Sequence, residues 1–304
     1  MDEAVNLSHL EPNLKIFMYK TTFTIFFIAL LSWHAIADPI LDRITVTVRG
    51  QGPDVILIPG LTCSSAVWDS TAAHLEGHYR LHIIQVAGFA GTPSLANANG
   101  PVIQPVLDAL DAYIKTNHLK SPRIIGHSLG GTMGMMLALQ HPEDVGGLMI
   151  VDALPFTGMI VGAKDAAAAE PIAAKMRDNT LKQSQEDFAR GEKRFLSILV
   201  KSPVGRKTAT EWAITSDKSV VARASYEDLT TDLRPKLADI KTPVTVLYSW
   251  DDASSYSKSE TDALYQQSYA GLPNKTLVRI DGSYHFIMFD QPDLFSAQVD
   301  KFLQ

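Results

Sequence analysis

The sequence has a single cysteine, Cys63, among 304 residues, so an intramolecular disulfide and a cysteine-based metal site are both excluded. It also has no basic excess, because 27 lysines and arginines stand against 33 aspartates and glutamates, with no block of five like charges. A nucleic-acid partner is therefore not expected. Hydrophobic residues make up 46% of the chain, which is enough for a packed core and excludes a low-complexity protein.

Residues 21–37 contain no Asp, Glu, Lys or Arg and include the hydrophobic block Ile25–Leu31. Lys15 and Lys20 precede this stretch, and the small residues of Ala35–Ala37 close it. This order is typical of a secretory signal peptide, with cleavage expected after Ala37. The sequence therefore predicts an exported protein, periplasmic or secreted.

Two alternatives to a cleaved signal stay open. The stretch could be an N-terminal membrane anchor, although a spanning helix needs about 20 apolar residues and Ser32 and His34 interrupt this one. It could also be a buried core helix, which Asp38-Pro39 directly afterwards disfavours. Met18 is an alternative translation start. No stable membrane insertion of the mature chain is expected.

The mature chain alternates short apolar runs with longer helical patterns, which indicates a mostly parallel sheet flanked by helices, an α/β fold. Several runs are apolar at consecutive positions, as in strands buried on both faces. The predicted strands are Ile44–Val48, Val55–Ile58, Tyr79–Val86, Arg123–Ile125, Gly147–Val151, Val244–Tyr248 and Thr276–Ile280. The predicted helices are Ala66–Leu75, Val102–His118, Gly131–Gln140, Ser259–Ala270 and Pro292–Phe302.

Residues 156–240 interrupt this alternation and have few β-branched runs. We expect three or four helices there, inserted as a lid over the carboxyl edge of the sheet; an independent helical domain is the alternative. The core then comprises residues 38–155 and 241–304. Phe188, Phe195 and Leu199 could line an acyl pocket or form the core of the lid.

Residues 123–131 contain the motif G-x-S-x-G between an apolar strand and a helix. A sharp turn at this place forces Ser128 into an unfavourable backbone conformation and raises its hydroxyl above the sheet. Side chains at Gly126 and Gly130 would collide across such a turn. The motif therefore predicts Ser128 as a nucleophile, which needs a positioned base and an orienting acid.

Among the histidines, His285 lies in a loop between the last strand and the last helix and is the expected general base. The side chain of His127 should diverge from that of Ser128, its neighbour. His74, His78 and His82 are spaced four apart and could hold a metal on one helix, but Gly77 interrupts it. No metal site and no cofactor are expected.

The acid should lie between Ser128 and His285 in the sequence. Asp252 is favoured because it follows the penultimate strand at the correct edge of the sheet. Asp251 is the alternative acid, and Asp152, which follows the strand after the nucleophile, is a third candidate.

Two N–H groups are needed to stabilise the oxyanion of a tetrahedral intermediate. Leu129, directly after the nucleophile, should supply one. Leu61 should supply the other, since Gly60 lets that loop approach closely. Cys63 lies nearby and is interpreted as a buried spacer, with a second thiol nucleophile as the alternative.

These residues resemble the α/β-hydrolase superfamily over about residues 44–303. The matching landmarks are the Pro59-Gly60 loop, Gly88–Thr92, Gly126–Gly131, the acid segment and His285. The resemblance implies an eight-stranded sheet, a helical cap, no cofactor, and acyl transfer to water through an acyl-enzyme. It also implies Ser128, Asp252 and His285 as the triad, with Leu61 and Leu129 as oxyanion donors.

Three positions depart from the family pattern. Pro59 stands where many relatives have histidine, Val86 where they have aspartate, and Ser249 where a glycine often precedes the acid segment. The last departure leaves the choice between Asp251 and Asp252 open.

The expected function is that of an exported serine hydrolase acting on a small-molecule carboxylic ester. The alternatives are other triad chemistry (C–C or amide hydrolysis, or acyl transfer to an alcohol) and a ligand-binding protein with little turnover.

Overall fold

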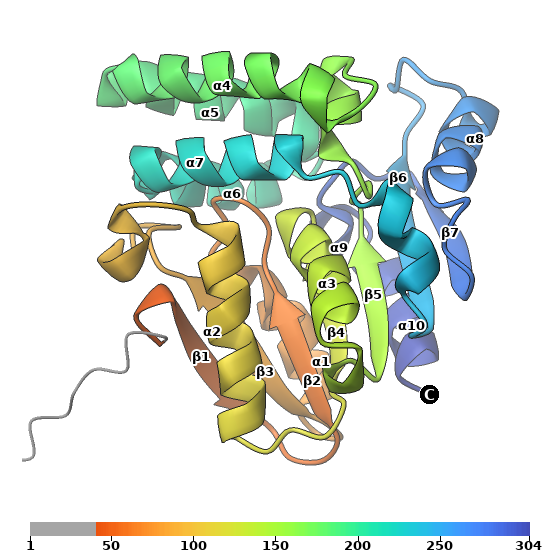
Figure 1. The fold of residues 1–304 in the computed structure, drawn as a ribbon. Coiled ribbons are helices and arrows are strands. Elements are labelled where there is room, and N and C mark those ends of the chain that lie inside the picture. Colours follow the sequence, from red (N-terminus) through yellow and green to blue (C-terminus); the bar gives the residue numbers. More distant parts are fainter. Residues whose placement is uncertain (1–40) are drawn as a thin grey trace, which may run out of the picture. The chain divides into compact units, whose positions relative to one another are not determined.

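Seven strands form one sheet within residues 41–304, the part of the chain that the computed structural model describes (Figure 1). Their order is β1-β3-β2-β4-β5-β6-β7; β1 is antiparallel to β3 and the other neighbours are parallel. The predicted, mostly parallel α/β fold is confirmed, although the described residues form seven strands and not eight. The strands are β1 (Ile44–Arg49), β2 (Asp54–Ile58), β3 (Arg80–Val86), β4 (Arg123–His127), β5 (Gly147–Val151), β6 (Val244–Trp250) and β7 (Lys275–Asp281).

Helices cover both faces of this sheet. In β2, Ile56 and Ile58 belong to one hydrophobic core, while Val55 and Leu57 belong to the other. Successive side chains of a strand point to opposite faces, so a strand covered on both sides must be apolar throughout. The first core is closed by α2 (Ile103–Thr116), α3 (Leu129–Gln140) and α8 (Lys258–Ser268), and the second by α1 (Asp69–Leu75) and α10 (Pro292–Leu303).

Four helices lie between β5 and β6, and we call them the inserted helices. They are α4 (Ala166–Lys182), α5 (Gln185–Leu199), α6 (Pro203–Thr215) and α7 (Lys218–Thr230). Helix α4 packs against α7, and α5 packs against α6 (Figure 1). The chain then returns to the same sheet, because β6 pairs in parallel with β5. The segment is thus an insertion into one sheet.

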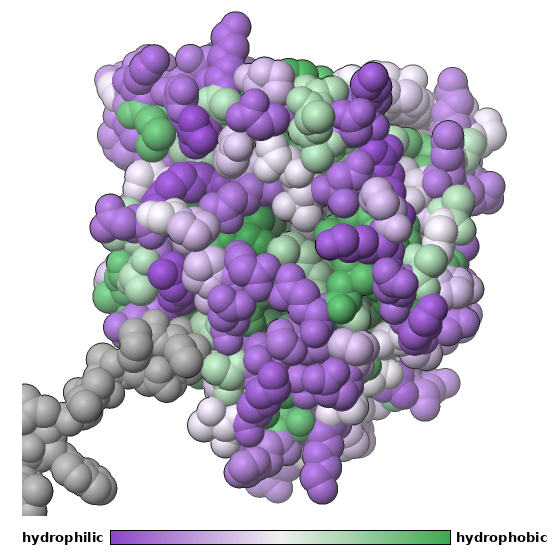
Figure 2. Space-filling model, viewed as in Figure 1, coloured by the Kyte–Doolittle hydropathy of each residue, from purple (hydrophilic) through white to green (hydrophobic). Residues whose placement is uncertain are grey.

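The predicted signal peptide of residues 1–37 and the alternative start at Met18 lie outside the described residues. Among the helices of residues 41–304, none has both the length and the hydrophobicity that a bilayer-spanning helix needs. The face of the molecule drawn in Figure 2 is largely hydrophilic, and hydrophobic surface gathers in its hollows.

Candidate active site

The turn between β4 and α3 holds Ser128 in a strained conformation. Its φ is 53° and its ψ is −121°, a combination that residues other than glycine rarely adopt. The Ser128 N–H donates to the carbonyl oxygen of Val151 on the neighbouring strand at 2.9 Å. The serine therefore stands at the carboxyl edge of the sheet, at the start of a helix.

Two glycines make this turn sterically possible. A Cβ atom at Gly126 would lie 2.2 Å from the Gly130 oxygen, and one at Gly130 would lie 2.3 Å from the Ile58 oxygen. Real Cβ atoms do not approach backbone oxygens so closely. The collision predicted from the sequence is thus found at both positions.

His285 follows β7 and the 3-residue connection that begins with Gly282. Its Nδ1 lies 2.8 Å from Oδ2 of Asp152, and His285, Asp152 and Ser128 all line one cavity. A histidine bound at Nδ1 by a carboxylate presents Nε2 for proton transfer. The structure thus brings a serine, a histidine and an aspartate to one place.

The structure does not bring the favoured acid, Asp252, or its alternative, Asp251, into contact with His285. Asp251 pairs with the ammonium of Lys201 at 2.6 Å, which lowers the pKa of that carboxyl, and its other oxygen accepts from the Ala253 N–H at 3.0 Å. Asp252 is exposed. Neither contacts His285; Asp152, at the end of the adjacent strand β5, does.

Asp152 is held in place by β6 and α8. Its carboxylate accepts hydrogen bonds from the Ser249 N–H at 2.7 Å, the Ser249 hydroxyl at 3.1 Å and the Tyr265 hydroxyl at 3.2 Å. Its φ is 51°, so the residue turns out of the strand direction towards His285. Ser249, which stands where relatives often have a glycine, is therefore a hydrogen-bond partner of the candidate acid.

His127 supports the loop that carries His285, which we call the histidine loop. Its Nε2 lies 3.1 Å from the backbone oxygen of His285, to which it can only donate, and the two rings are 4.7 Å apart. Burial, and then the charge of His285, hold the pKa of His127 well below its ordinary value, so the ring is neutral. The side chain diverges from that of Ser128, as expected, and fixes the backbone beside the candidate base.

Leu61 and Leu129 both line the cavity beside Ser128. Neither backbone N–H donates a hydrogen bond among residues 41–304. Gly60 allows this approach, because a Cβ atom there would lie 3.1 Å from Cβ of Ser128 and 2.9 Å from Nδ1 of His127. Both N–H groups are therefore available to an oxyanion, as the prediction from the sequence requires of them.

The cavity has a volume of about 700 Å³ and lies between the carboxyl edge of the sheet and the inserted helices. Phe195 and Leu199 of α5 line it, whereas Phe188 is buried in the core and does not. Phe195 and Leu199 thus fit the expected acyl pocket, and Phe188 fits the expected core of the inserted segment. Further apolar lining comes from Leu154, Ile160, Val161, Met176, Leu196 and Leu229.

Two carboxyl groups that the sequence did not single out also line this cavity. Burial raises the pKa of Asp228, on α7, to about 6 and that of Glu192, on α5, to about 7. Single acidic residues within amphipathic helices look like solvated surface charges. Only the folded position of each helix shows that these two face the cavity.

Neither a thiol nucleophile at Cys63 nor a metal site at His74, His78 and His82 is supported by the described residues. Burial raises the pKa of Cys63 to about 12, so its thiol is not an activated nucleophile. His74 bonds Asp300, and His82 bonds Asp54, so the histidines spaced four apart diverge.

Within residues 41–304, one group of side chains could hold a metal, and it lies outside this cavity. Asp111, His141 and Asp144 place their ligand atoms within 4.8 Å of one another. Lys115 already lies 2.8 Å from Asp111 as a counter-charge.

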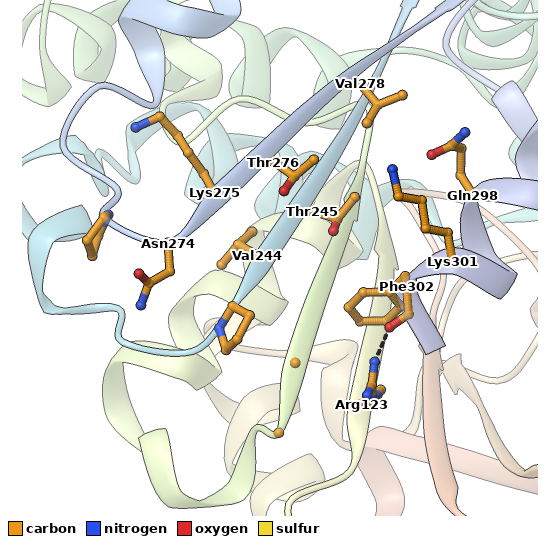
Figure 3. A pocket seen from close by; sticks show the side chains of 14 residues that line it. Arg123, Val244, Thr245, Asn274, Lys275, Thr276, Val278, Gln298, Lys301 and Phe302 are labelled. Atoms are coloured by element: carbon orange, nitrogen blue, oxygen red, sulfur yellow. Dashed lines mark hydrogen bonds between the residues drawn. The ribbon is translucent and has the colours of Figure 1, made fainter. Parts of the chain in front are cut away.

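A second cavity of about 540 Å³ lies at the amino ends of β4 to β7, the edge opposite Ser128 (Figure 3). Arg123 donates there to the Phe302 carbonyl. None of the predicted catalytic residues lines it, so it is not the candidate site.

Comparisons with known proteins bear on the family and the fold of the chain. The model of the alpha/beta hydrolase family matches residues 55–298. The pimeloyl-[acyl-carrier protein] methyl ester esterase of Vibrio atlanticus is 27% identical over 277 residues, covering 86% of this chain and 99% of the relative. The enzyme of the same name from Pectobacterium carotovorum is 29% identical over 267 residues, covering 83% and 94%.

Solved structures share the fold. A Pseudomonas aeruginosa hydrolase superposes with a TM-score of 0.69 at 21% identity, covering 86% of this chain and 94% of that one. A Thermogutta terrifontis esterase gives a TM-score of 0.71 at 17% identity, covering 86% and 92%. With the strained serine turn and the family match over most of its length, the chain belongs to the alpha/beta hydrolase family.

Proposed function

We propose that the protein hydrolyses carboxylic esters through an acyl-enzyme formed on Ser128. The observation that carries this proposal is the meeting of Ser128 with the His285–Asp152 pair at one cavity. The likeness to proteins named as methyl ester esterases supports an ester as the substrate class.

In the first half of the reaction, the Ser128 oxygen attacks the ester carbonyl carbon while Nε2 of His285 takes the hydroxyl proton. The N–H groups of Leu61 and Leu129 stabilise the negative oxygen of the tetrahedral intermediate. The intermediate collapses, the C–O bond to the alcohol breaks, and His285 returns its proton to the leaving alcohol.

In the second half, His285 takes a proton from water, and the resulting hydroxide attacks the acyl carbon. Collapse of the second intermediate releases the carboxylic acid and regenerates the Ser128 hydroxyl with the proton from His285. Asp152 accepts the hydrogen bond from Nδ1 throughout and stabilises the imidazolium form.

The test is a panel of p-nitrophenyl and methyl esters of increasing acyl length, hydrolysed by the wild type and by Ser128→Ala. We expect turnover by the wild type, no turnover above background by the variant, and labelling of the wild type at Ser128 by a fluorophosphonate. A folded wild-type protein that neither turns over any ester nor reacts with the probe would falsify the proposal.

We also propose that the protein is exported, which rests on the signal-like residues 15–37. Mass spectrometry of the protein recovered from its native cells should find Asp38 as the first residue. An N-terminus at Met1 or Met18 on all of the recovered protein contradicts export by this signal.

A further inference from the structure

Asp228 is a carboxyl group that the proposed reaction does not use. It lies on α7 in the wall of the cavity, and its Oδ1 is buried without a hydrogen-bond partner among residues 41–304. The hydroxyls of Thr132 and Thr157 lie beside this carboxyl and favour its charged form, but neither makes a hydrogen bond of ordinary geometry to Oδ1. Thr132 follows Ser128 by about one turn of α3, so these polar groups lie close to the candidate nucleophile.

Asp152 and Asp217 are fully occupied, whereas Asp111 Oδ1 and Asp144 Oδ2, which lie outside this cavity, also lack a partner among residues 41–304. Asp152 accepts four hydrogen bonds, and Asp217 accepts bonds from Ser94, from Ser219 and from two backbone N–H groups. A buried acceptor without a partner destabilises the fold. Its retention on a cavity wall beside the reaction centre is what a ligand-binding group requires.

The charge of His285, the candidate base, acts on Asp228 and opposes the rise in the pKa of that carboxyl. Arg177 lines the same cavity, but its guanidinium bonds Asp178 at 2.9 Å and stacks over the Tyr226 ring, 4.7 Å from the ring centre. Glu192 adds a second carboxyl to the lining. Because the pKa of Asp228 is about 6 and that of Glu192 about 7, both carboxyls are ionised above pH 7, where the space suits a group that donates hydrogen bonds or carries positive charge and disfavours an anion.

We propose that Asp228 binds a hydrogen-bond donor of the substrate, a hydroxyl or an ammonium group, and so selects esters that carry one. This inference rests on the proposed function and names the substrate class of the same site. Asp228 is thereby a specificity-determining residue, whose unpartnered Oδ1 accepts the hydrogen bond of the substrate's donor.

The experiment compares four esters of one alcohol whose acyl chains have equal length and end in methyl, hydroxyl, ammonium or carboxylate. The enzymes are the wild type, Asp228→Asn, Asp228→Leu and the control Asp239→Asn, which removes an exposed carboxylate outside the cavity. The quantity measured is kcat/KM for each ester relative to the methyl-ended ester.

We expect the wild type and Asp239→Asn to prefer the hydroxyl-ended or the ammonium-ended ester by about tenfold or more, and to disfavour the carboxylate. The Leu variant should lose either preference, because it has no acceptor. The Asn variant separates the two donors: it keeps an acceptor for a hydroxyl but no charge for an ammonium.

Equal kcat/KM values of the wild type for the three uncharged and cationic esters overturn the inference, and so does a preference that persists in the Leu variant. In both cases ester hydrolysis itself stands. Absence of all hydrolysis together with no probe labelling at Ser128 removes the proposed function as well, so the two failures are distinguishable.

Discussion

At the scale of single residues, the acid of the candidate triad is the feature that the structure moved. Asp152 bonds His285 at 2.8 Å, whereas Asp251 is neutralised by Lys201. We expect Asp152→Asn to lower kcat on an ester by about 10³–10⁴-fold, because the imidazole loses its orienting carboxylate. Asp252→Asn is the matched control and should retain kcat within about twofold. The reverse ranking in steady-state kinetics would restore Asp252 as the acid.

The sequence could not decide between these carboxylates, because all three follow strands that end at the same edge. The deciding quantities are the positive φ of Asp152 and the direction in which Ser249 points its N–H and hydroxyl. The position of Ser128 and His285 at one cavity was predictable, because the strained turn demands glycines at fixed spacing and the last strand ends at the same edge of the sheet. The serine in place of glycine before the acid segment was the available clue to Asp152.

We expect the stability of the protein to depend on pH through Glu192. Burial raises its pKa from 4.5 to about 7, so the fold favours the neutral carboxyl. The contribution of the neutral Glu192 carboxyl to the free energy of unfolding is fully present below about pH 4.5. It is lost as the pH rises through 7, because the buried group must then ionise. We expect Glu192→Gln to raise the Tm by about 2–4 °C at pH 8 and to leave it nearly unchanged at pH 4. Calorimetry at both pH values checks this, and an equal gain at pH 4 contradicts it.

At the scale of elements, the β4–α3 turn tolerates no side chain where it is tightest. Gly130→Ala places a Cβ atom 2.3 Å from the Ile58 oxygen and should cost about 1–3 kcal/mol of the free energy of unfolding, with loss of activity. Gly191→Ala is the matched control, since that glycine in α5 has open space around it and should gain about 0.5–1 kcal/mol. Urea denaturation measures both, and equal effects of the two substitutions would refute the steric argument.

The helices and strands themselves follow from sequence periodicity with only small shifts at their ends. The predicted strand Val244–Tyr248 extends to Trp250, and the predicted helix Ala66–Leu75 is a 3₁₀ turn followed by α1. Burial on both faces makes such strands apolar at every position, which the sequence shows directly. The course of the inserted helices was less predictable, because their cavity-facing side is a mixture of apolar and acidic residues.

At the scale of the whole molecule, Asp290 of α9 (Ile287–Asp290) ties the inserted helices to the histidine loop. Its carboxylate accepts from the N–H groups of Lys201 and Ser202, between α5 and α6, and from that of Tyr284 beside His285. The position of the inserted helices, which line the cavity, is thus coupled to the position of the candidate base.

We expect Asp290→Ala to lower the free energy of unfolding by about 1.5–3 kcal/mol, because charge-assisted hydrogen bonds are lost, and to lower kcat/KM as well. Asp293→Ala, an exposed aspartate three residues later, is the control and should change stability by less than about 0.5–1 kcal/mol. Denaturation and ester kinetics on both variants test the coupling. Unchanged kinetics in a destabilised Asp290→Ala protein would show that the inserted helices and the base are independent.

The burial of Cys63, the sole thiol of the chain, has a practical consequence. A cysteine introduced at an exposed position such as Ile198 on α5 becomes the only sulfhydryl accessible to a maleimide in the native state. A fluorophore or spin label can then be attached there without first removing a natural cysteine, so movements of this helix can be followed spectroscopically in the otherwise unaltered enzyme.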